Sequence, residues 1–185
     1  MDNLNQKSLK SKVKSKFKKG LTLIEAAMVL AISTLVVAGV MVFFQSASMN
    51  SKTNEAVAQL GEMQSIIRSI YANSPNYNGV SSAALISANA LPNKMISGAT
   101  VVHAFNSTVI VAAADSGCSG CRNSFYITLN NIPAEACSKL GTMDLGRGFV
   151  SLRINTTDIG LPTNVTTVGA ACGGSGNTSM RWQFL

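Results

Sequence analysis

The sequence predicts an α+β fold in which a long N-terminal α-helix, its apolar half protruding, packs on a mainly antiparallel β-sheet. Three observations predict this fold. An uncharged apolar run at 26–44 continues into residues with helical spacing, a break follows at 74–76, and the remainder holds short runs rich in Val, Ile, Thr and aromatic residues. A length of 185 residues suits one globular domain with an appended segment.

The first twenty residues form a hydrophilic basic leader. They carry seven lysines and one aspartate, a net +6 out of the chain's formal charge of +7. The residues that follow are nearly neutral as a group. The sequence therefore predicts no basic face and no nucleic-acid partner.

The apolar run is long enough to span a membrane. From Ala26 to Phe44 nineteen residues pass without a charge, and Ser33 and Thr34 are the only polar ones. A helix of this length measures about 28 Å, close to the roughly 30 Å hydrocarbon core of a bilayer. The lysines before the run predict a cytoplasmic N-terminus and export of everything beyond Phe44.

Beyond Phe44 the predicted helix becomes amphipathic. Its apolar residues are spaced by threes and fours, as expected of a helix that packs one face on a domain. They are Ala56, Val57, Leu60, Met63, Ile66, Ile67 and Ile70. We predict one continuous helix over 22–71, with Gly39 and Gly61 as its soft points.

The residues after this helix predict strands and two short helices. Strands are expected where β-branched and aromatic residues gather, at 99–104, 108–113, 125–129, 149–154 and 180–184. One short helix is expected at 134–140, between Pro133 and Gly141, and another at 82–90, before Pro92. Helices gathered on one side of such a sheet define the α+β class.

The junction between leader and helix carries a specific motif. Residues 18–25 read Lys-Lys-Gly-Leu-Thr-Leu-Ile-Glu, which resembles the type IV pilin signature. In that family a membrane peptidase cuts after the glycine and methylates the new N-terminus, and the fifth mature residue is a glutamate. Gly20 and Glu25 match both positions. The resemblance implies cleavage between Gly20 and Leu21, and N-methylation of Leu21.

Further features resemble the type IVb class of these pilins. A twenty-residue leader and Leu rather than Phe at position 21 are similar to prepilins of bundle-forming and conjugative thin pili. The stretches at 44–48, 136–137 and 145–146 also resemble bundle-forming pilins. The implied organisation is a leader at 1–20, a transmembrane and polymerisation helix at 21–48, and a head domain with the type IV pilin fold at 49–185.

The function implied by the resemblance is that of a structural subunit of a type IVb pilus, serving adhesion, aggregation or conjugative mating contact. The implied partners are further copies of the chain, the prepilin peptidase, the inner-membrane pilus assembly machinery and a host or recipient cell surface. The implied location is the inner membrane before assembly and the extracellular pilus afterwards. A minor pilin or a type II secretion pseudopilin is the alternative within the same assembly class.

Glu25 places a carboxylate at the start of the apolar run. A charged side chain costs about 2.5 to 3.5 kcal/mol at a bilayer centre on insertion scales, so Glu25 requires a partner or a functional explanation. We expect its partner in the filament to be the amine of Leu21 on a neighbouring subunit, a contact that sets the axial register. A position near the lipid headgroups without a special role is the alternative.

Two simpler interpretations of the N-terminus compete with the pilin motif. An ordinary secretory signal would be cut near 46–48, but the run is longer than such signals and Glu25 interrupts its beginning. A plain single-span anchor explains the hydrophobicity and the orientation. It does not explain the pattern from Gly20 to Glu25.

The four cysteines, Cys118, Cys121, Cys137 and Cys172, all lie in the exported part, where their even count fits two disulfides. The pilin resemblance implies that one bond joins Cys137 to Cys172. Cys118 and Cys121 form a Cys-x-x-Cys pair, which suits a redox centre, half of a zinc site or a small structural disulfide. We favour the structural bond because the flanking residues do not predict a βαβ unit.

The sequence does not predict an enzyme. No pair of nucleophile and base and no phosphate-binding loop stands out, and His103 is interpreted as a surface or half-buried strand residue. We expect neither a metal nor an organic cofactor. A membrane-anchored thiol-disulfide protein, working through Cys118 and Cys121, is the remaining alternative from another functional class.

Overall fold

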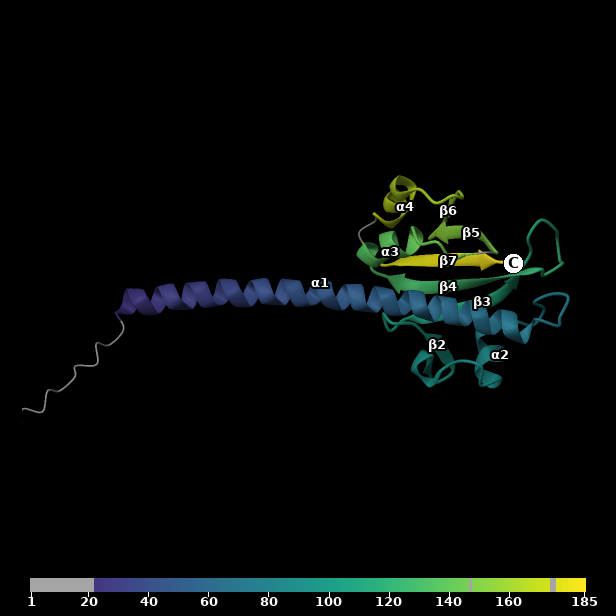
Figure 1. Cartoon of the computed structure of the whole chain (residues 1–185), viewed down its shortest axis with the longest axis horizontal. Coiled ribbons are helices and arrows are strands. Elements are labelled where there is room, and N and C mark those ends of the chain that lie inside the picture. The colour runs from purple at the N-terminus through teal and green to yellow at the C-terminus, as the bar shows by residue number, and fades with distance from the viewer. Residues whose placement is uncertain (1–21, 147, 174–175) are drawn as a thin grey trace, which may run out of the picture. The chain divides into compact units, whose positions relative to one another are not determined.

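A computed structural model of the chain describes residues 22–146, 148–173 and 176–185. Helix α1 (Leu23–Ile70) is uninterrupted, in agreement with the helix predicted over 22–71 (Figure 1). The chain divides into two compact units: the first ends at Phe43, and the second, the head unit, comprises Phe44–Leu185. The predicted cleavage-site residues Gly20 and Leu21 lie outside the described residues.

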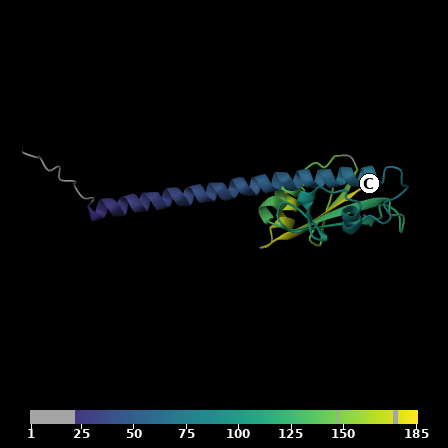
Figure 2. The ribbon, with the colours of Figure 1, turned by 90° about the horizontal axis from the view of Figure 1, so that it is seen from below.

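The part of α1 that belongs to the head unit runs along the rest of that unit (Figure 2), and it buries one face. Ala56, Leu60, Met63 and Ile67 keep at most 1% of their surface exposed. These residues follow the predicted spacing by threes and fours. Gly61 lies among them without interrupting the helix, because burial of an apolar face outweighs the low helix propensity of one glycine.

The head unit contains a seven-stranded antiparallel sheet with the order β1-β2-β3-β4-β7-β5-β6. The strands are β1 (Ile96–Ser97), β2 (Thr100–Val102), β3 (Thr108–Ala114), β4 (Ser124–Ile132), β5 (Phe149–Ile154), β6 (Thr157–Ile159) and β7 (Thr178–Phe184). The five predicted strands correspond to β2, β3, β4, β5 and β7, whereas β1 and β6 have no counterpart in the prediction. Because β7 lies between β4 and β5, the C-terminal strand ties the two parts of the sheet together.

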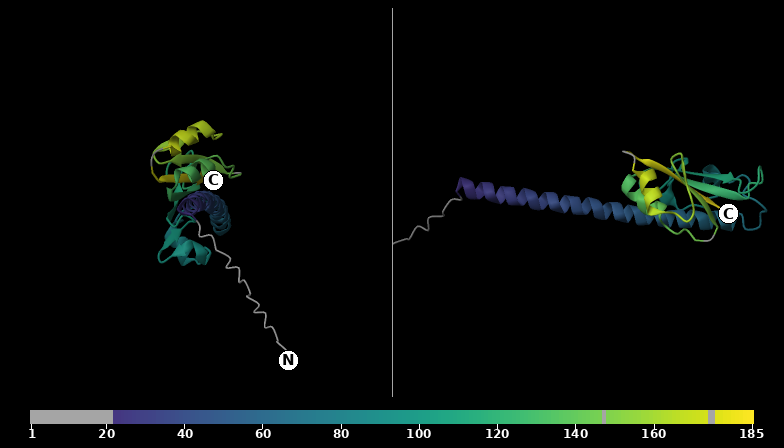
Figure 3. Two further views of the ribbon diagram at one scale, coloured as in Figure 1. Left: turned by 90° about the vertical axis from the view of Figure 1, so that its left-hand side faces the viewer. Right: turned by 90° about the horizontal axis from the view of Figure 1, so that it is seen from above.

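Short helices accompany the sheet: α2 (Ser82–Ser87), the 3-10 turn η1 (Asn93–Met95), α3 (Ala134–Gly141) and α4 (Val165–Cys172). Helix α2 ends earlier than predicted, and Asn89 follows it with a φ of 48°. Helix α4 was not predicted; the side chain of Asn164 caps it by accepting the N–H of Thr166 at 2.8 Å. Helices α3 and α4 lie side by side (Figure 3).

His103 lies in the turn that follows β2, so the prediction of a surface or half-buried strand residue is wrong. Only 2% of its surface is exposed. Its Nδ1 accepts the backbone N–H of Phe105 at 3.3 Å, and so Nε2 carries the proton and donates to the carbonyl oxygen of Asn130 at 2.8 Å. Burial lowers the pKa of His103, against a smaller opposite effect of Asn130. The neutral ring thus holds the turn against β4.

Acidification is expected to destabilise the head unit through His103. An unfolded histidine titrates near pH 6.5 and the folded-state pKa is lower, so in this range the unfolded chain binds a proton that the folded chain does not. Stability is therefore full above about pH 6.5 and falls as the pH decreases toward the folded-state pKa. Thermal unfolding of the detergent-solubilised chain between about pH 7.5 and 5 measures this slope. His103→Gln, which cannot titrate, is expected to flatten it, and an unchanged slope would contradict the assignment.

Candidate assembly site

A capping box begins helix α1. Oε2 of Glu25 accepts the backbone N–H and the hydroxyl of Thr22, both at 2.9 Å, and the hydroxyl oxygen of Thr22 accepts the N–H of Glu25 at 3.3 Å. These N–H groups have no carbonyl partner inside a helix, so the reciprocal bonds stabilise its first turn. The carboxylate also lies at the positive end of the helix dipole.

Glu25 retains one carboxylate oxygen for a further donor. Both bonds from Thr22 end on Oε2, and Oε1 accepts none from the residues that the structure describes. The side chain is exposed. The site can therefore receive an amine at Oε1 without giving up its role at the helix start.

The residues after Glu25 present an apolar surface. Every large apolar side chain from Met28 to Phe44 keeps more than half of its surface exposed, with 57% for Val29 and 75% for Phe43. By length and composition, α1 is a helix that could cross a membrane. An apolar surface of this size requires lipid or protein to cover it.

A disulfide joins Cys137 of α3 to Cys172 of α4. Both cysteines are buried, and they are 35 residues apart in the sequence. A bond closing a loop of this length stabilises the fold by about 4 kcal/mol in the chain-entropy account. The two helices also approach closely at Gly141, where an added Cβ would lie 2.6 Å from Cγ1 of Val168.

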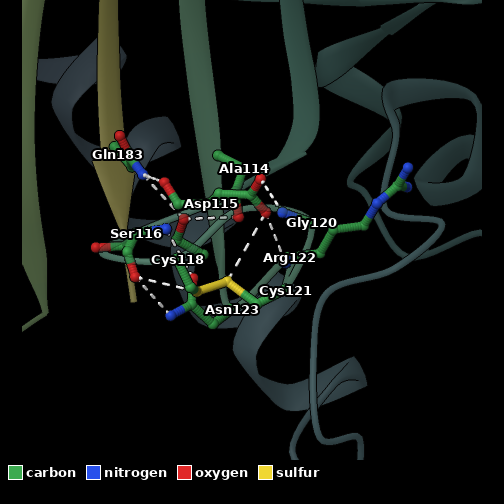
Figure 4. The surroundings of a disulfide bond; sticks show 10 residues. Ala114, Asp115, Ser116, Cys118, Gly120, Cys121, Arg122, Asn123 and Gln183 are labelled. Atoms are coloured by element: carbon green, nitrogen blue, oxygen red, sulfur yellow. Dashed lines mark hydrogen bonds between the residues drawn. A yellow bond between two sulfur atoms is a disulfide. The ribbon is translucent and has the colours of Figure 1, made fainter.

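The second disulfide joins Cys118 to Cys121 in the loop between β3 and β4 (Figure 4). Asp115 organises this loop, because its two carboxylate oxygens accept the N–H groups of Gly120 and Arg122 at 2.7 Å each. These bonds lower the pKa of Asp115. Asn123 exchanges two hydrogen bonds of 2.8 Å with the backbone of Ser116. The ring therefore closes a hairpin loop that is already ordered by hydrogen bonds.

The loop provides a structural setting for the Cys-x-x-Cys pair. It connects two antiparallel strands, whereas the Cys-x-x-Cys motif of thioredoxin-like redox centres occurs near a βαβ unit. In the part of the chain that the structure describes, no group of three or more His, Cys, Asp or Glu residues could hold a metal ion.

Comparison with known proteins identifies the family. Residues 45–184 match the family described as Bundlin. This chain belongs to the bundlin family. The match lies in the head unit, so it is independent of the Gly20-to-Glu25 motif at the N-terminus. Family and fold together confirm the predicted resemblance to type IVb pilins.

Two curated relatives of this bundlin are described as the major structural subunit of the bundle-forming pilus. The relative from Escherichia coli O111:H- is 32% identical over 156 residues, which are 83% of this chain and 78% of the relative. The relative from Escherichia coli O127:H6 (strain E2348/69 / EPEC) is 31% identical over the same shares. Both support a structural subunit rather than an enzyme.

Two solved structures confirm the fold. The type IVb pilin from Salmonella typhi matches with a TM-score of 0.56 at 20% identity, covering 70% of this chain and 97% of that one. TcpA, a type IV pilin from Vibrio cholerae El Tor, matches with a TM-score of 0.53 at 13% identity, covering 73% and 99%. The predicted long helix with an antiparallel sheet is confirmed as a type IV pilin fold.

Two features of this bundlin escaped the sequence analysis. The first is the capping bond between Thr22 and Glu25. The sequence does contain a signal for it, because Thr-x-x-Glu before an apolar run is a helix-start signature. The role of Asp115 depends on a loop that folds back on its carboxylate, and no spacing rule in the sequence indicates this.

Proposed function

We propose that this bundlin is the major structural subunit of a type IVb pilus. It is made as a precursor in the inner membrane, cleaved after Gly20 by a prepilin peptidase and N-methylated on Leu21. The assembly machinery then moves the mature chain into an extracellular filament. The observation that carries this proposal is an exposed apolar helix, begun by a carboxylate, on a chain of the bundlin family.

The helix supplies the driving force for polymerisation, and Glu25 supplies the register. Burying a large apolar side chain contributes about 1.5 to 3 kcal/mol, and α1 offers more than ten such side chains between Met28 and Phe44. Apolar packing alone allows helices to slide along one another. An ion pair between Oε1 of Glu25 and the amine of Leu21 on a neighbour forms at only one axial position of the two helices. It also removes the cost of an unpaired charge.

Filaments sheared from cells that produce the chain test this function. We expect their main protein to begin at Leu21 with one added methyl group and to contain both disulfides, as measured by intact mass and N-terminal sequencing. A trace amount in filaments made mainly of another chain would indicate a minor pilin or a pseudopilin instead. Absence from filaments would contradict the proposal.

A further inference from the structure

The outward face of the sheet carries a row of polar residues across four strands. The strand register pairs Thr128 of β4 with Arg181 of β7, Arg181 with Arg153 of β5, and Arg153 with Asp158 of β6. Two arginines thus lie directly opposite each other, which disfavours strand pairing unless other groups engage their charges. The row borders a cavity of about 250 Å³ that Tyr126 and Gln183 also line.

Arg153 is engaged within the chain. Its Nε and one Nη donate to the two oxygens of Asp158 at 2.6 and 2.8 Å. This two-pronged bond lowers the pKa of Asp158, and the charge of Arg181 contributes to the same shift. Arg153 and Asp158 thereby neutralise each other and leave Arg181 as the net charge of the row.

Arg181 is held in position by its neighbours, and its Nη groups are available as hydrogen-bond donors. Its Nε donates to the hydroxyl of Thr128 at 3.2 Å, and its guanidinium carbon lies 4.3 Å from the centre of the Tyr126 ring. Its two Nη groups donate to no other residue in the described part of the chain. A planar guanidinium fixed in this way loses little freedom on binding, and its geometry matches a carboxylate.

The chain also exposes a carboxylate that lacks a partner. Within 22–146, 148–173 and 176–185, Glu135 is the one acidic side chain with neither a hydrogen bond nor an ion pair. It stands in the first turn of α3, and its expected helical partner four residues on, Lys139, donates to Asn50 of α1 instead. Glu135 is therefore free to pair outside its own chain.

We infer that Arg181, presented over Tyr126, binds the carboxylate of Glu135 on a second copy of this chain. The inference rests on the proposed function as a filament subunit. The two residues lie on different elements, β7 and α3, and in the proposed filament the contact joins unlike surfaces of successive subunits. Such a head-to-tail contact generates an open polymer rather than a closed dimer.

One exposed ion pair is weak, and this weakness favours a second copy of the chain over a free ligand as the partner of Arg181. A single exposed pair changes a binding equilibrium by about fivefold at most, which is too little to hold a free acidic molecule in a shallow cavity. In a filament the apolar helices already hold the neighbours together. The same pair then acts at a high effective concentration and repeats at every subunit.

Charge reversal with exchange tests the pair. Arg181→Glu and Glu135→Arg each replace the attraction by a repulsion that repeats at every subunit, so each is expected to lower the yield of sheared filaments by about fivefold or more. The double variant, with the charges exchanged, is expected to restore the yield to within about twofold. Lys52→Glu, which reverses another exposed cation with no partner among the described residues, is the matched control and is expected to assemble normally. The cell-associated amount of disulfide-bonded chain measures whether each variant folds. If a charge-reversal variant does not fold, Arg181→Gln or Glu135→Gln takes its place.

The outcomes separate this inference from the proposed function. Normal filaments from both single variants, or no recovery in the exchanged variant, would overturn the pair while leaving the pilin function intact. A wild-type chain that makes no filaments would overturn both. Wild-type filaments that retain an immobilised acidic sugar, lost in an Arg181→Glu variant that still assembles, would assign the cavity to acidic sugars instead.

Discussion

Replacement of Gly20 by Val is expected to leave full-length precursor in the inner membrane and cells without pili. The branched side chain adds bulk directly before the proposed scissile bond, where the peptidase accepts glycine. Two consequences follow from the lack of cleavage. The basic leader, with its net +6, stays attached to a helix that must enter an apolar filament core, and no amine forms at Leu21 to pair with Glu25. Immunoblots of membrane and sheared fractions measure both effects.

The control for this experiment is Gly20→Ala, which adds only a methyl group and is expected to be processed more completely than the Val variant. Normal processing of Gly20→Val would refute the proposed cleavage site. A native N-terminus at Met49 would refute it as well, because it would indicate an ordinary secretory signal removed after 46–48.

The elements that could be predicted from the sequence are those with a strong local pattern. Helix α1 combines an uncharged run with a regular apolar stripe, and its predicted bounds differ from the observed Leu23–Ile70 by one residue at each end. Strand β5 was predicted at its observed bounds, since Phe149, Val150 and Ile154 are aromatic or β-branched and turn residues flank the strand. The motif at Gly20 to Glu25 indicates the type IV pilin family without any contact in the head unit.

The elements that could not be predicted depend on contacts distant in sequence. Strand β6 is the exception, because it pairs with the adjacent strand β5 and its three residues are too few to show a strand pattern. Helix α4 is rich in Thr, Val and Gly, which are poor helix formers. Its last residue is tied to α3 by the disulfide from Cys137 to Cys172. His103 has the neighbours of a strand residue, but the turn after β2 buries it against Asn130. Arg181 and Arg153 become neighbours only through the position of β7 in the sheet.

Replacement of Glu25 by Gln is expected to yield abundant, cleaved and membrane-held chain with at least about tenfold fewer filaments. The substitution is selective because Gln also satisfies the third position of a capping box, so the start of α1 is preserved while the charge is removed. Membrane insertion becomes easier without an ionised group. A mutant subunit that docks at the filament base lacks the attraction between Oε1 and the neighbour's amine. The helices then pack by their apolar surfaces alone, which do not fix the axial position of one subunit relative to the next.

Thr22→Ala is the matched control for the Glu25→Gln experiment, because it removes the two capping bonds of the Thr22 hydroxyl and keeps the carboxylate. Loss of a cap costs about 0.5 to 2 kcal/mol at the first turn, which the rest of a long helix tolerates, so this variant is expected to make filaments. Co-expression of Glu25→Gln with wild type tests the intersubunit contact directly. If Glu25 pairs with a neighbour, mixed cells should show fewer or shorter pili, because a mutant subunit interrupts the register. Normal numbers of full-length filaments from Glu25→Gln alone would show that the apolar surface sets the packing without the charge.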